Sequence, residues 1–490
     1  MKVFQYLSAG LLVTLLGLVA TSCGDFLDKA PENSVPETSV DFTNVGNMYM
    51  PVSGVYAKVR TGGMHWIIWG LTNVRDDDMW SGRVDDQQML VDFGNYKYDS
   101  SFWGLNEMWN QYYGIIKVAN SAIESLESYV ANTTTPSDLA RKKAYEGEVR
   151  FLRAYAYYRL VQAFGPVTIL RSNSQTDLTR STVEAVRDYM LEDLQFAIDN
   201  APKLRPNEME HPGAVTAYSA MALAAKVYLN RGDYARVEAL TDEIINSGKF
   251  SLYPDFYEAF KIPGKLSDES LFECQNTDFG NGSGDLVDPG EWFTFQGPAN
   301  DGNISGWGFM GYYKEFRDWA KQRGETVRYE TSFLEAGTTT RSGDVIRPLQ
   351  NPTQTDCWNG KAYTPSNQLT PGRTKYGTNN NIRILRYADV LLMNAEAKVR
   401  QGKNGDQPFN LVRSRAEMPS LTGVTIDQII DERRMELCGE WGERYNDLVR
   451  TGLAASVLSS KGWIVAHTYY PIPLEQLTNS PALADEPKNE

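Results

Sequence analysis

Apolar residues recur at helical spacing in two separate parts of this chain of 490 residues. The clearest case is the segment 109–130, where the apolar positions fall on one face of a helix: Tyr112, Ile115, Ile116, Ala119, Ile123, Leu126 and Val130. The same spacing predicts further helices over residues 139–164, 182–200, 214–230, 235–246, 384–400, 409–416 and 426–438. The chain is therefore expected to be mostly α-helical.

The helices predicted over 214–230 and 235–246 are separated only by a short turn that contains Gly232, so we expect an antiparallel hairpin. Small residues such as Ala220 and Ala224 on one helix, facing larger residues on its neighbour, are typical of tetratricopeptide-like hairpins with a period of ~34 residues. A generic helical bundle fits the periodicity equally well.

The pattern changes between residues 250 and 382, where Gly, Asn, Pro and Thr cluster and the apolar run at 270–274 predicts a strand. Loops of this length within a compact protein are usually functional. A second loop-rich stretch is expected over 60–105. We therefore expect a single domain over 45–490, built from a helical scaffold at about 105–250 and 383–450 and an irregular ligand-binding lobe at about 250–382 with the loops of 60–105.

The first 22 residues have the pattern of an export signal, because Lys2 precedes an apolar run of 14 residues that is too short to span a bilayer. Small residues then precede Cys23, as in the lipobox of bacterial lipoproteins, where the cysteine becomes the mature N-terminus and carries lipid. Several acyl chains together anchor a protein stably, so Cys23 is the expected lipidation site and 23–44 the expected lipidated tether. Plain secretion is the alternative, and no later segment is apolar enough to span a membrane.

Composition and motifs exclude several other classes of function. The net charge of −14 and the absence of a basic patch argue against binding to nucleic acid. Cys274, Cys357 and Cys438 have no histidine at zinc-ligand spacing, so buried free thiols, or one disulfide and one thiol, are expected. The acidic run 76–78 lacks the spacing of a calcium-binding loop and is expected to be a solvated turn. We predict no metal, no cofactor and no catalytic residue.

Several blocks of residues follow one another in an order that is specific, although each block alone would be weak evidence. They are 23–28 with Pro31, 150–155 with 164–167, 386–397 with 410–416, 432–437 with 442–452, and 470–473. Together these blocks resemble the SusD/RagB family of surface lipoproteins from the nutrient-uptake systems of Bacteroidetes. Thr168 stands where the family usually has a second proline, and 479–482 lack the usual ending, which affects only local geometry.

The resemblance implies a mostly α, SusD-like fold in which tetratricopeptide-like hairpins support an irregular lobe with short strands. It also implies a protein on the outer membrane, lipid-anchored and facing the cell surface, that captures a glycan and delivers it to a SusC-like TonB-dependent transporter without catalysis of its own. The charged residues of these blocks are expected to form ion pairs from helix to helix, or to cap helix ends, rather than to take part in chemistry.

Sugar rings present C–H groups on one face and hydroxyls at the edge, so a glycan site needs exposed aromatic side chains beside polar groups. The chain carries 57 aromatic residues among its 490, and some should lie on the surface. The candidate ligand-binding residues, in stretches that resemble in position the glycan-site loops of the family, are Trp66, Trp80, Arg83, Trp292 and Trp307. Trp307, between two glycines, is equally compatible with a structural role.

Three alternatives remain open from the sequence. The same architecture could bind peptides, although abundant loop tryptophans favour sugar. A secreted helical glycoside hydrolase would require two carboxylates opposed across an aromatic cleft. A purely structural tetratricopeptide-like adaptor would have no small-molecule pocket.

Overall fold

The computed structural model describes residues 40–81, 86–133, 135–278, 280, 292–299, 304, 306–348, 355–372 and 379–489. Cys23, most of the expected tether and Arg83 lie outside these residues. The helices are α3 (Met50–Lys58), α4 (Trp66–Asn73), α5 (Gln88–Gly94), α6 (Trp103–Val130), α7 (Pro136–Phe164), α8 (Val183–Asn200), α9 (Ala217–Arg231), α10 (Tyr234–Asn246), α11 (Lys314–Gln322), α12 (Val327–Ser332), α13 (Tyr387–Arg400), α14 (Asp406–Arg415), α15 (Ile426–Glu436), α16 (Glu443–Arg450), α17 (Ala454–Leu458) and α18 (Leu474–Asn479).

The described strands pair in three antiparallel ribbons of two strands each. These ribbons are β1 (Met79–Ser81) with β3 (Met310–Tyr312), β2 (Ser270–Cys274) with β6 (Ile382–Arg386), and β4 (Phe333–Glu335) with β5 (Cys357–Asn359). Short turns of 3₁₀ or π helix lie at Val45–Asn47, Val59–Gly63, Pro206–Glu208, Glu258–Phe260, Ile262–Gly264, Ser366–Gln368, Ser459–Lys461, Val465–His467 and Pro481–Ala484.

Local signals in the sequence fix where the long helices begin and end. The side chain of Thr135 caps α7 by accepting a hydrogen bond from the backbone N–H of Asp138, and a proline occupies the first turn. The helix α9 begins with a capping box between Thr216 and Ser219 and ends at Gly232 in the left-handed conformation. The mostly helical fold predicted from periodicity is confirmed.

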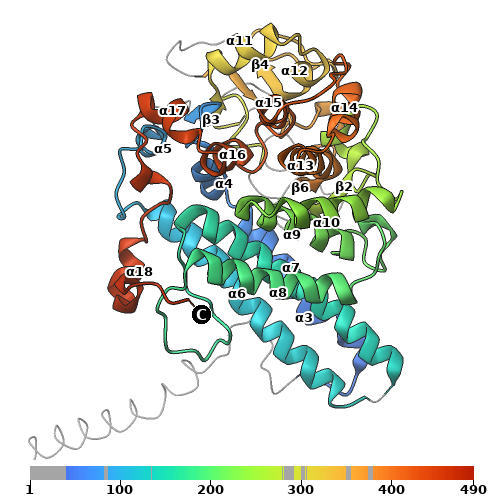
Figure 1. The fold of residues 1–490 in the computed structure, drawn as a ribbon. Helices are drawn as coiled ribbons and strands as arrows, with labels where there is room; N and C mark the ends of the chain where they lie inside the picture. The colour runs from blue at the N-terminus through green and yellow to red at the C-terminus, as the bar shows by residue number, and fades with distance from the viewer. Residues whose placement is uncertain are drawn as a thin grey trace, which may run out of the picture.

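The helices form one continuous stack, although the sequence of the scaffold is interrupted. The helices α6, α7 and α8 pack side by side, α9 packs on α8 and α10, and α13 packs on α10, α14 and α15 (Figure 1). The ribbon β2–β6 joins the beginning of the interrupting segment to its end, so β6 delivers the chain directly into α13. The second half of the scaffold is thereby placed against the first.

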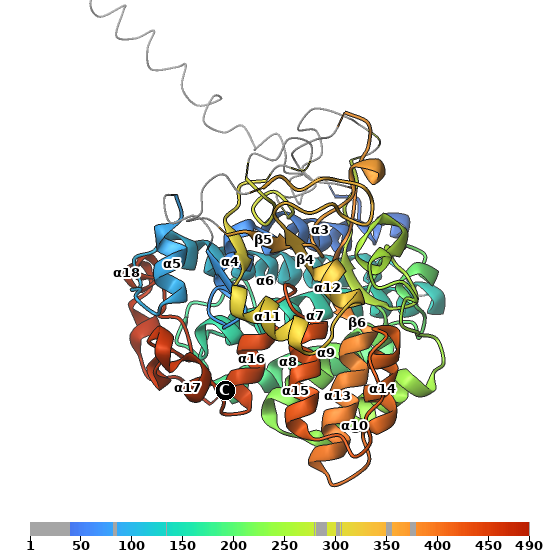
Figure 2. The same cartoon turned by 90° about the horizontal axis from the view of Figure 1, so that it is seen from above.

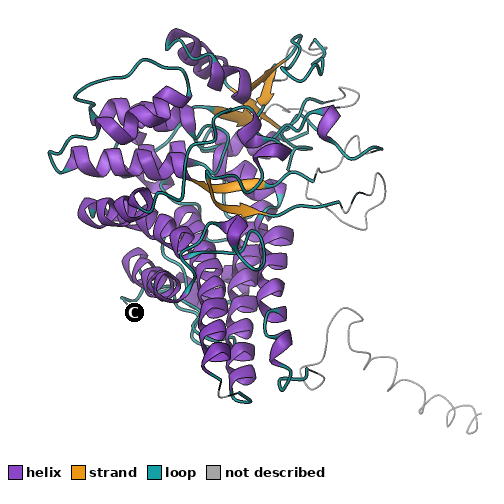
Figure 3. Cartoon of the chain, turned by 90° about the vertical axis from the view of Figure 1, so that its right-hand side faces the viewer, coloured by secondary structure: helices purple, strands orange, loops and turns teal. Residues whose placement is uncertain are grey.

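The strands and the longer loops gather at one end of the molecule, and the opposite end consists of helices (Figure 3). Seen from above, α11, α12, β4 and β5 lie over the long helices α6 and α7 (Figure 2), and β3 of the same segment pairs with β1, which contacts α4. The irregular segment therefore covers the end of the stack where α4 lies. None of the helices in the described ranges is long and apolar enough to cross a membrane.

Two expectations about local structure are wrong. The stretch 60–105 is not mainly loop, because it contains α4, α5 and the start of α6. The helix α4 is buried on nearly every side, so its sequence lacks the amphipathic period by which helices are recognised. Residues Ile384–Arg386, predicted to begin a helix, belong instead to the fully buried strand β6. Cys274, Cys357 and Cys438 are buried free thiols, one of the two expected outcomes.

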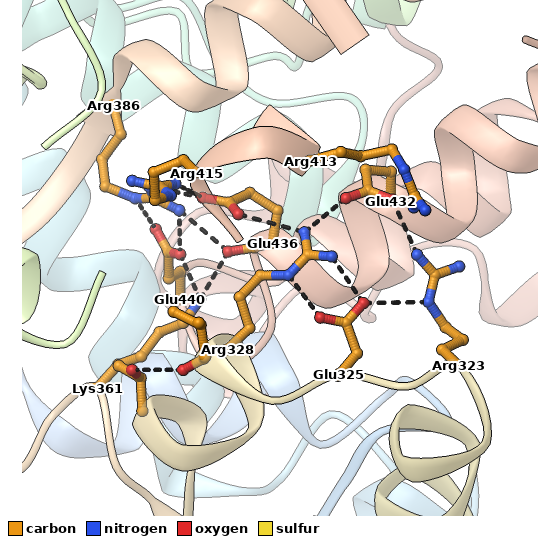
Figure 4. Close-up of polar contacts among 12 residues, drawn as sticks. Arg323, Glu325, Arg328, Lys361, Arg386, Arg413, Arg415, Glu432, Glu436 and Glu440 are labelled. Carbon is orange, nitrogen blue, oxygen red and sulfur yellow. Dashed lines mark hydrogen bonds and ion pairs between the residues drawn. The ribbon is translucent and has the colours of Figure 1, made fainter. Parts of the chain in front are cut away.

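A buried network of ion pairs joins the irregular lobe to the scaffold (Figure 4). Arg328 of α12 is fully buried and contacts Glu325 at 2.6 Å and Glu432 of α15 at 2.6 Å. Farther along α15, Glu436 contacts Arg386 at 3.1 Å. The expectation that these charged residues serve as ion pairs is confirmed.

The arginines determine the charge state of Glu436. Burial opposes ionisation of this carboxyl, but Arg415, Arg386 and Arg328 outweigh burial and lower its pKa to about 2. The lobe is therefore fastened to α15 by groups that remain charged at neutral pH.

Candidate functional site

Aromatic side chains from three distant segments meet at the start of α4, and we call this group the tryptophan cluster: Trp66, Trp103, Trp307 and Phe309. The ring of Trp66 lies 5.3 Å from Phe309, 5.9 Å from Trp103 and 6.2 Å from Trp307, measured between centroids. Trp103 is 52% exposed, whereas Trp66 and Trp307 are half-buried. The cluster thus offers the ring of Trp103 and parts of Trp66 and Trp307 to solvent, whereas Phe309 is buried beneath them.

A second, inner group of aromatic rings supports this cluster. Phe295 is fully buried and lies 6.4 Å from Trp66, 5.2 Å from Trp69 and 6.3 Å from Trp292. Trp292 also stacks on Trp441 at 5.2 Å, near the last scaffold helices. Packed aromatic pairs of this kind add about 0.5–1.5 kcal/mol each beyond simple burial, so the inner group is a rigid base.

Backbone hydrogen bonds hold the segment 292–299 beside 306–309. The N–H of Trp307 donates to the carbonyl of Thr294 at 2.5 Å, and the N–H of Phe309 donates to the carbonyl of Phe295 at 3.0 Å. Between them, Gly308 adopts a φ of 69°, which glycine adopts without strain. This pairing brings Trp307 and Phe309 to the same side of the fold as α4.

The helix α4 is fixed at both of its ends. At its start, Nδ1 of His65 accepts a hydrogen bond from the N–H of Ile67 at 3.4 Å, and burial lowers the pKa of His65, which favours the neutral form required of an acceptor. At its end, the amide of Asn73 donates to the carbonyl of Glu440 at 3.3 Å. Trp66 therefore projects from a helix that has little freedom to move.

Trp80 belongs to a neighbouring aromatic pair. In the ribbon β1–β3 it lies opposite Gly311, and its ring stacks on Tyr313 at 6.0 Å with an interplanar angle of 20°. The Nζ atom of Lys461 lies 5.1 Å from the centre of the Tyr313 ring. Phe309 and Tyr313 are four residues apart along one nearly extended segment, so the pair lies roughly 13 Å from the tryptophan cluster.

The acidic run beside Trp80 is not the solvated turn that its sequence suggested. Asp76 and Asp78 are buried, and Asp77 is paired with Arg434 at 2.8 Å and with Arg444 at 2.8 Å. Burial, together with the charges of Asp78 and Asp77, raises the pKa of Asp76 to about 7. The run anchors the start of β1 to the C-terminal helices, which the sequence could not show because the partners lie far along the chain.

The structure thus brings together three of the five candidates, since Trp66 and Trp307 share the tryptophan cluster and Trp292 lies in its base. Trp80 stands in the adjacent pair, and Arg83 falls outside the described residues. Sequence reasoning missed Trp103 and Tyr313. The aromatic residue Trp103 begins α6 six residues earlier than periodicity predicted, and Tyr313 directly follows a short strand.

Exposed, rigidly supported aromatic rings are suited to packing against the C–H faces of a carbohydrate or against apolar side chains. Within the described ranges, no group of three His, Cys, Asp or Glu side chains is arranged to hold a metal ion.

Comparison with known proteins gives a consistent result. Residues 25–229 match a SusD-like family model described as starch-binding and associating with the outer membrane, and residues 292–461 match the SusD family model. A SusD-like protein from Bacteroides ovatus is 24% identical, covering 91% of this chain and 83% of that protein. SusD-like protein P2 from Formosa agariphila is 26% identical, covering 94% of this chain and 93% of that protein.

Solved structures resemble the whole described fold. Surface glycan-binding protein A from Bacteroides thetaiotaomicron is 25% identical with a TM-score of 0.76, covering 90% of this chain and 98% of that one. The same protein in complex with laminarihexaose is similar to this chain with a TM-score of 0.75.

Proposed function

Because the chain belongs to the SusD family, we propose that it is a cell-surface lipoprotein that binds an oligosaccharide or polysaccharide through the tryptophan cluster. The observation that carries this proposal is the convergence of Trp66, Trp103 and Trp307 on a rigid aromatic base at one end of the helical stack. The similar surface protein from Bacteroides thetaiotaomicron is named for glycan binding, which supports the same class of ligand.

The remaining parts of the proposal concern placement and partners. Cys23 would carry the lipid that holds the protein on the outer membrane, facing the cell surface, and a SusC-like TonB-dependent transporter would receive the glycan. The protein would act by binding alone, without a cofactor. The family match to outer-membrane association supports this placement.

Peptide binding by the same surface is the alternative, because aromatic faces also accept apolar side chains. Binding experiments with both classes of ligand distinguish glycan binding from peptide binding.

The test uses the chain from residue 24 onward, which lacks the lipidation site, in affinity electrophoresis through gels that contain laminarin, xyloglucan, starch or other polysaccharides. Retardation by one polysaccharide, clearly reduced in Trp66→Ala and Trp103→Ala, is the expected result. Trp319→Ala, which removes a half-buried tryptophan of α11, is the matched control and should be retarded normally. Absence of retardation by every polysaccharide, with binding of a peptide library instead, would reject the glycan proposal.

Lipidation and partner are tested separately. Expression of the full chain with a labelled fatty acid should give a labelled protein in the outer-membrane fraction, and Cys23→Ala should be unlabelled. Co-purification of the lipidated chain with an identified TonB-dependent transporter from the same host is expected. Recovery of the protein in the medium would favour plain secretion.

A further inference from the structure

Two buried arginines in the scaffold differ from the others in having no acidic partner. Arg75 and Arg159 are only 3% and 5% exposed. Arg153 and Arg433, by contrast, contact Asp193 and Asp389 at 2.7 Å and 2.6 Å. Within the described part of the chain, neither Arg75 nor Arg159 has a carboxylate within 4 Å. Burying a guanidinium without a counter-charge is costly, so this pair requires an explanation.

The guanidinium of Arg75 is held in place by aromatic rings. It lies 4.0 Å from the centre of the Tyr445 ring and 4.2 Å from that of Tyr470. Its Nη2 atom donates to the carbonyl of Gln162 at 3.4 Å, whereas Nε and Nη1 are buried and have no hydrogen-bond partner. The carboxylate of the adjacent Asp76 accepts from the backbone N–H groups of Asp78 and Met79 instead.

Arg159 approaches the same place from α7. Its Nη1 atom donates to the side-chain oxygen of Gln162 at 3.2 Å and to the carbonyl of Trp441 at 3.1 Å, and Nη2 donates to the hydroxyl of Thr72 at 3.3 Å. These acceptors are all neutral. The amide nitrogen of Gln162, like two nitrogens of Arg75, is buried with no partner.

Both arginines line one small cavity together with Gln162, Tyr112 and Asn446. The centre of a water-sized sphere can move within about 10 Å³ there, so the cavity has room for one small molecule or ion. The three buried nitrogens without partners are all donors. A water molecule there could accept from them, but it would leave the positive charge uncompensated.

We propose that this cavity binds a single halide ion, chloride under ordinary conditions, between Arg75, Arg159 and Gln162. The ion supplies the missing negative charge and accepts hydrogen bonds from the unpartnered donors, and although larger than a water molecule it is a single compact sphere. A halide has no hydrogens to donate and so needs no acceptor atom in the site. A water molecule would also have to donate its own two hydrogens.

The ion would join three distant parts of the chain. Arg75 follows α4, Arg159 and Gln162 belong to α7, and Asn446 belongs to α16, which lies beside α4 in the fold (Figure 1). Since α4 also carries Trp66, halide binding would stabilise the helix from which the tryptophan cluster is built. The inference does not depend on which ligand that cluster binds.

The experiment measures thermal unfolding of the chain from residue 24 onward in sodium chloride, sodium bromide and sodium gluconate at equal ionic strength. We expect the midpoint to be higher in both halides than in gluconate, by roughly one to several degrees. Gln162→Glu places a carboxylate in the cavity, so its midpoint should no longer respond to halide. Gln322→Glu makes the same change at an exposed position of α11 and should respond as the parent protein does.

Crystals grown in bromide provide the second measurement. An anomalous bromine peak between Arg75 and Arg159 would establish the site even if Gln162→Glu failed to fold. A water molecule in the cavity, or bromine only elsewhere, would overturn the assignment whatever the melting curves showed. Equal midpoints in halide and gluconate, without a bromine peak, would also overturn it.

Discussion

The rings of Trp66 and Phe309 lie 5.3 Å apart, although one belongs to a helix near the N-terminus and the other precedes a strand of the irregular lobe. The proposed binding surface therefore exists only when the lobe is folded against α4. Ligand binding therefore depends on the buried contacts between lobe and scaffold. A mutation of an exposed ring should weaken binding alone, whereas a mutation of a buried contact should lower the stability of the fold.

Replacing an exposed member of the cluster should weaken binding without loss of stability. Trp103 is 52% exposed, so Trp103→Ala removes an aromatic face that is available to a sugar ring, and we expect roughly 3- to 10-fold weaker binding in isothermal titration. Trp69, in the base, is fully buried, and Trp69→Ala should instead lower the free energy of unfolding by about 3–5 kcal/mol. Unchanged binding by Trp103→Ala would place the ligand elsewhere.

Breaking the buried ion network should destabilise the protein strongly. Arg328 is fully buried between Glu325 and Glu432, so Arg328→Met removes one positive charge from the buried network. The two carboxylates then keep only the partly exposed Arg323 and, for Glu432, Arg413. We expect a loss of about 3–5 kcal/mol in urea unfolding. The exposed pair Lys203–Glu243 is the control, and Lys203→Met should cost at most about 1 kcal/mol. Similar small losses for both variants would show that the network contributes little.

Much of the scaffold could be predicted from the sequence, because helices such as α6 and α8 expose one side and bury the other. The helix α4 could not be recognised in this way, since a helix buried on all sides has no polar face. Tryptophans in loop-rich stretches identified Trp66, Trp292 and Trp307 as candidates. That these three residues converge, and that Trp103 joins them, depends on contacts between distant segments that no local pattern encodes.

The acidic run 76–78 is a second case in which contacts between distant segments decide the structure. Asp77 and Asp78 have the local pattern of a hydrophilic turn, but Arg434, 356 residues beyond Asp78, donates to both carboxylates. Asp78 is buried and Asp77 is half-buried. This pairing attaches the residues before β1 to the C-terminal helices α15 and α16. Sequence reasoning identifies the charged residues, and only the fold shows their partners.

The stability of the protein should depend on pH through Glu148. Burial raises the pKa of this carboxyl to about 8 from an ordinary value of 4.5, although the hydroxyls of Tyr56 and Tyr49 donate to it at 2.7 Å and 3.1 Å. The protonated form is therefore favoured by folding. Its contribution to stability is fully present below about pH 4.5 and is lost as the pH rises towards 8.

Glu148→Gln removes this titration while keeping an oxygen that accepts from both tyrosines. Compared with the parent protein, the variant should gain stability progressively between pH 4.5 and pH 8, by a few kcal/mol in total. Chemical denaturation at several pH values measures the difference. Glu124→Gln, at an exposed position of α6, should show no such trend, and a pH-independent difference for Glu148→Gln would contradict the argument.

Gly442 is the position where a single methyl group should affect both stability and binding. Its φ is 73°, and a Cβ atom there would lie 2.5 Å from Cγ2 and 2.9 Å from the backbone oxygen of Thr72, at the end of α4. Gly248 has a φ of 65° with nothing within 4 Å, so Gly248→Ala measures the conformational strain alone, about 1–2 kcal/mol. Gly442→Ala should cost distinctly more in urea unfolding, and by displacing α4 it should also weaken ligand binding at Trp66. Equal losses for the two variants would mean that α4 adjusts freely, and that the cluster does not depend on a fixed α4.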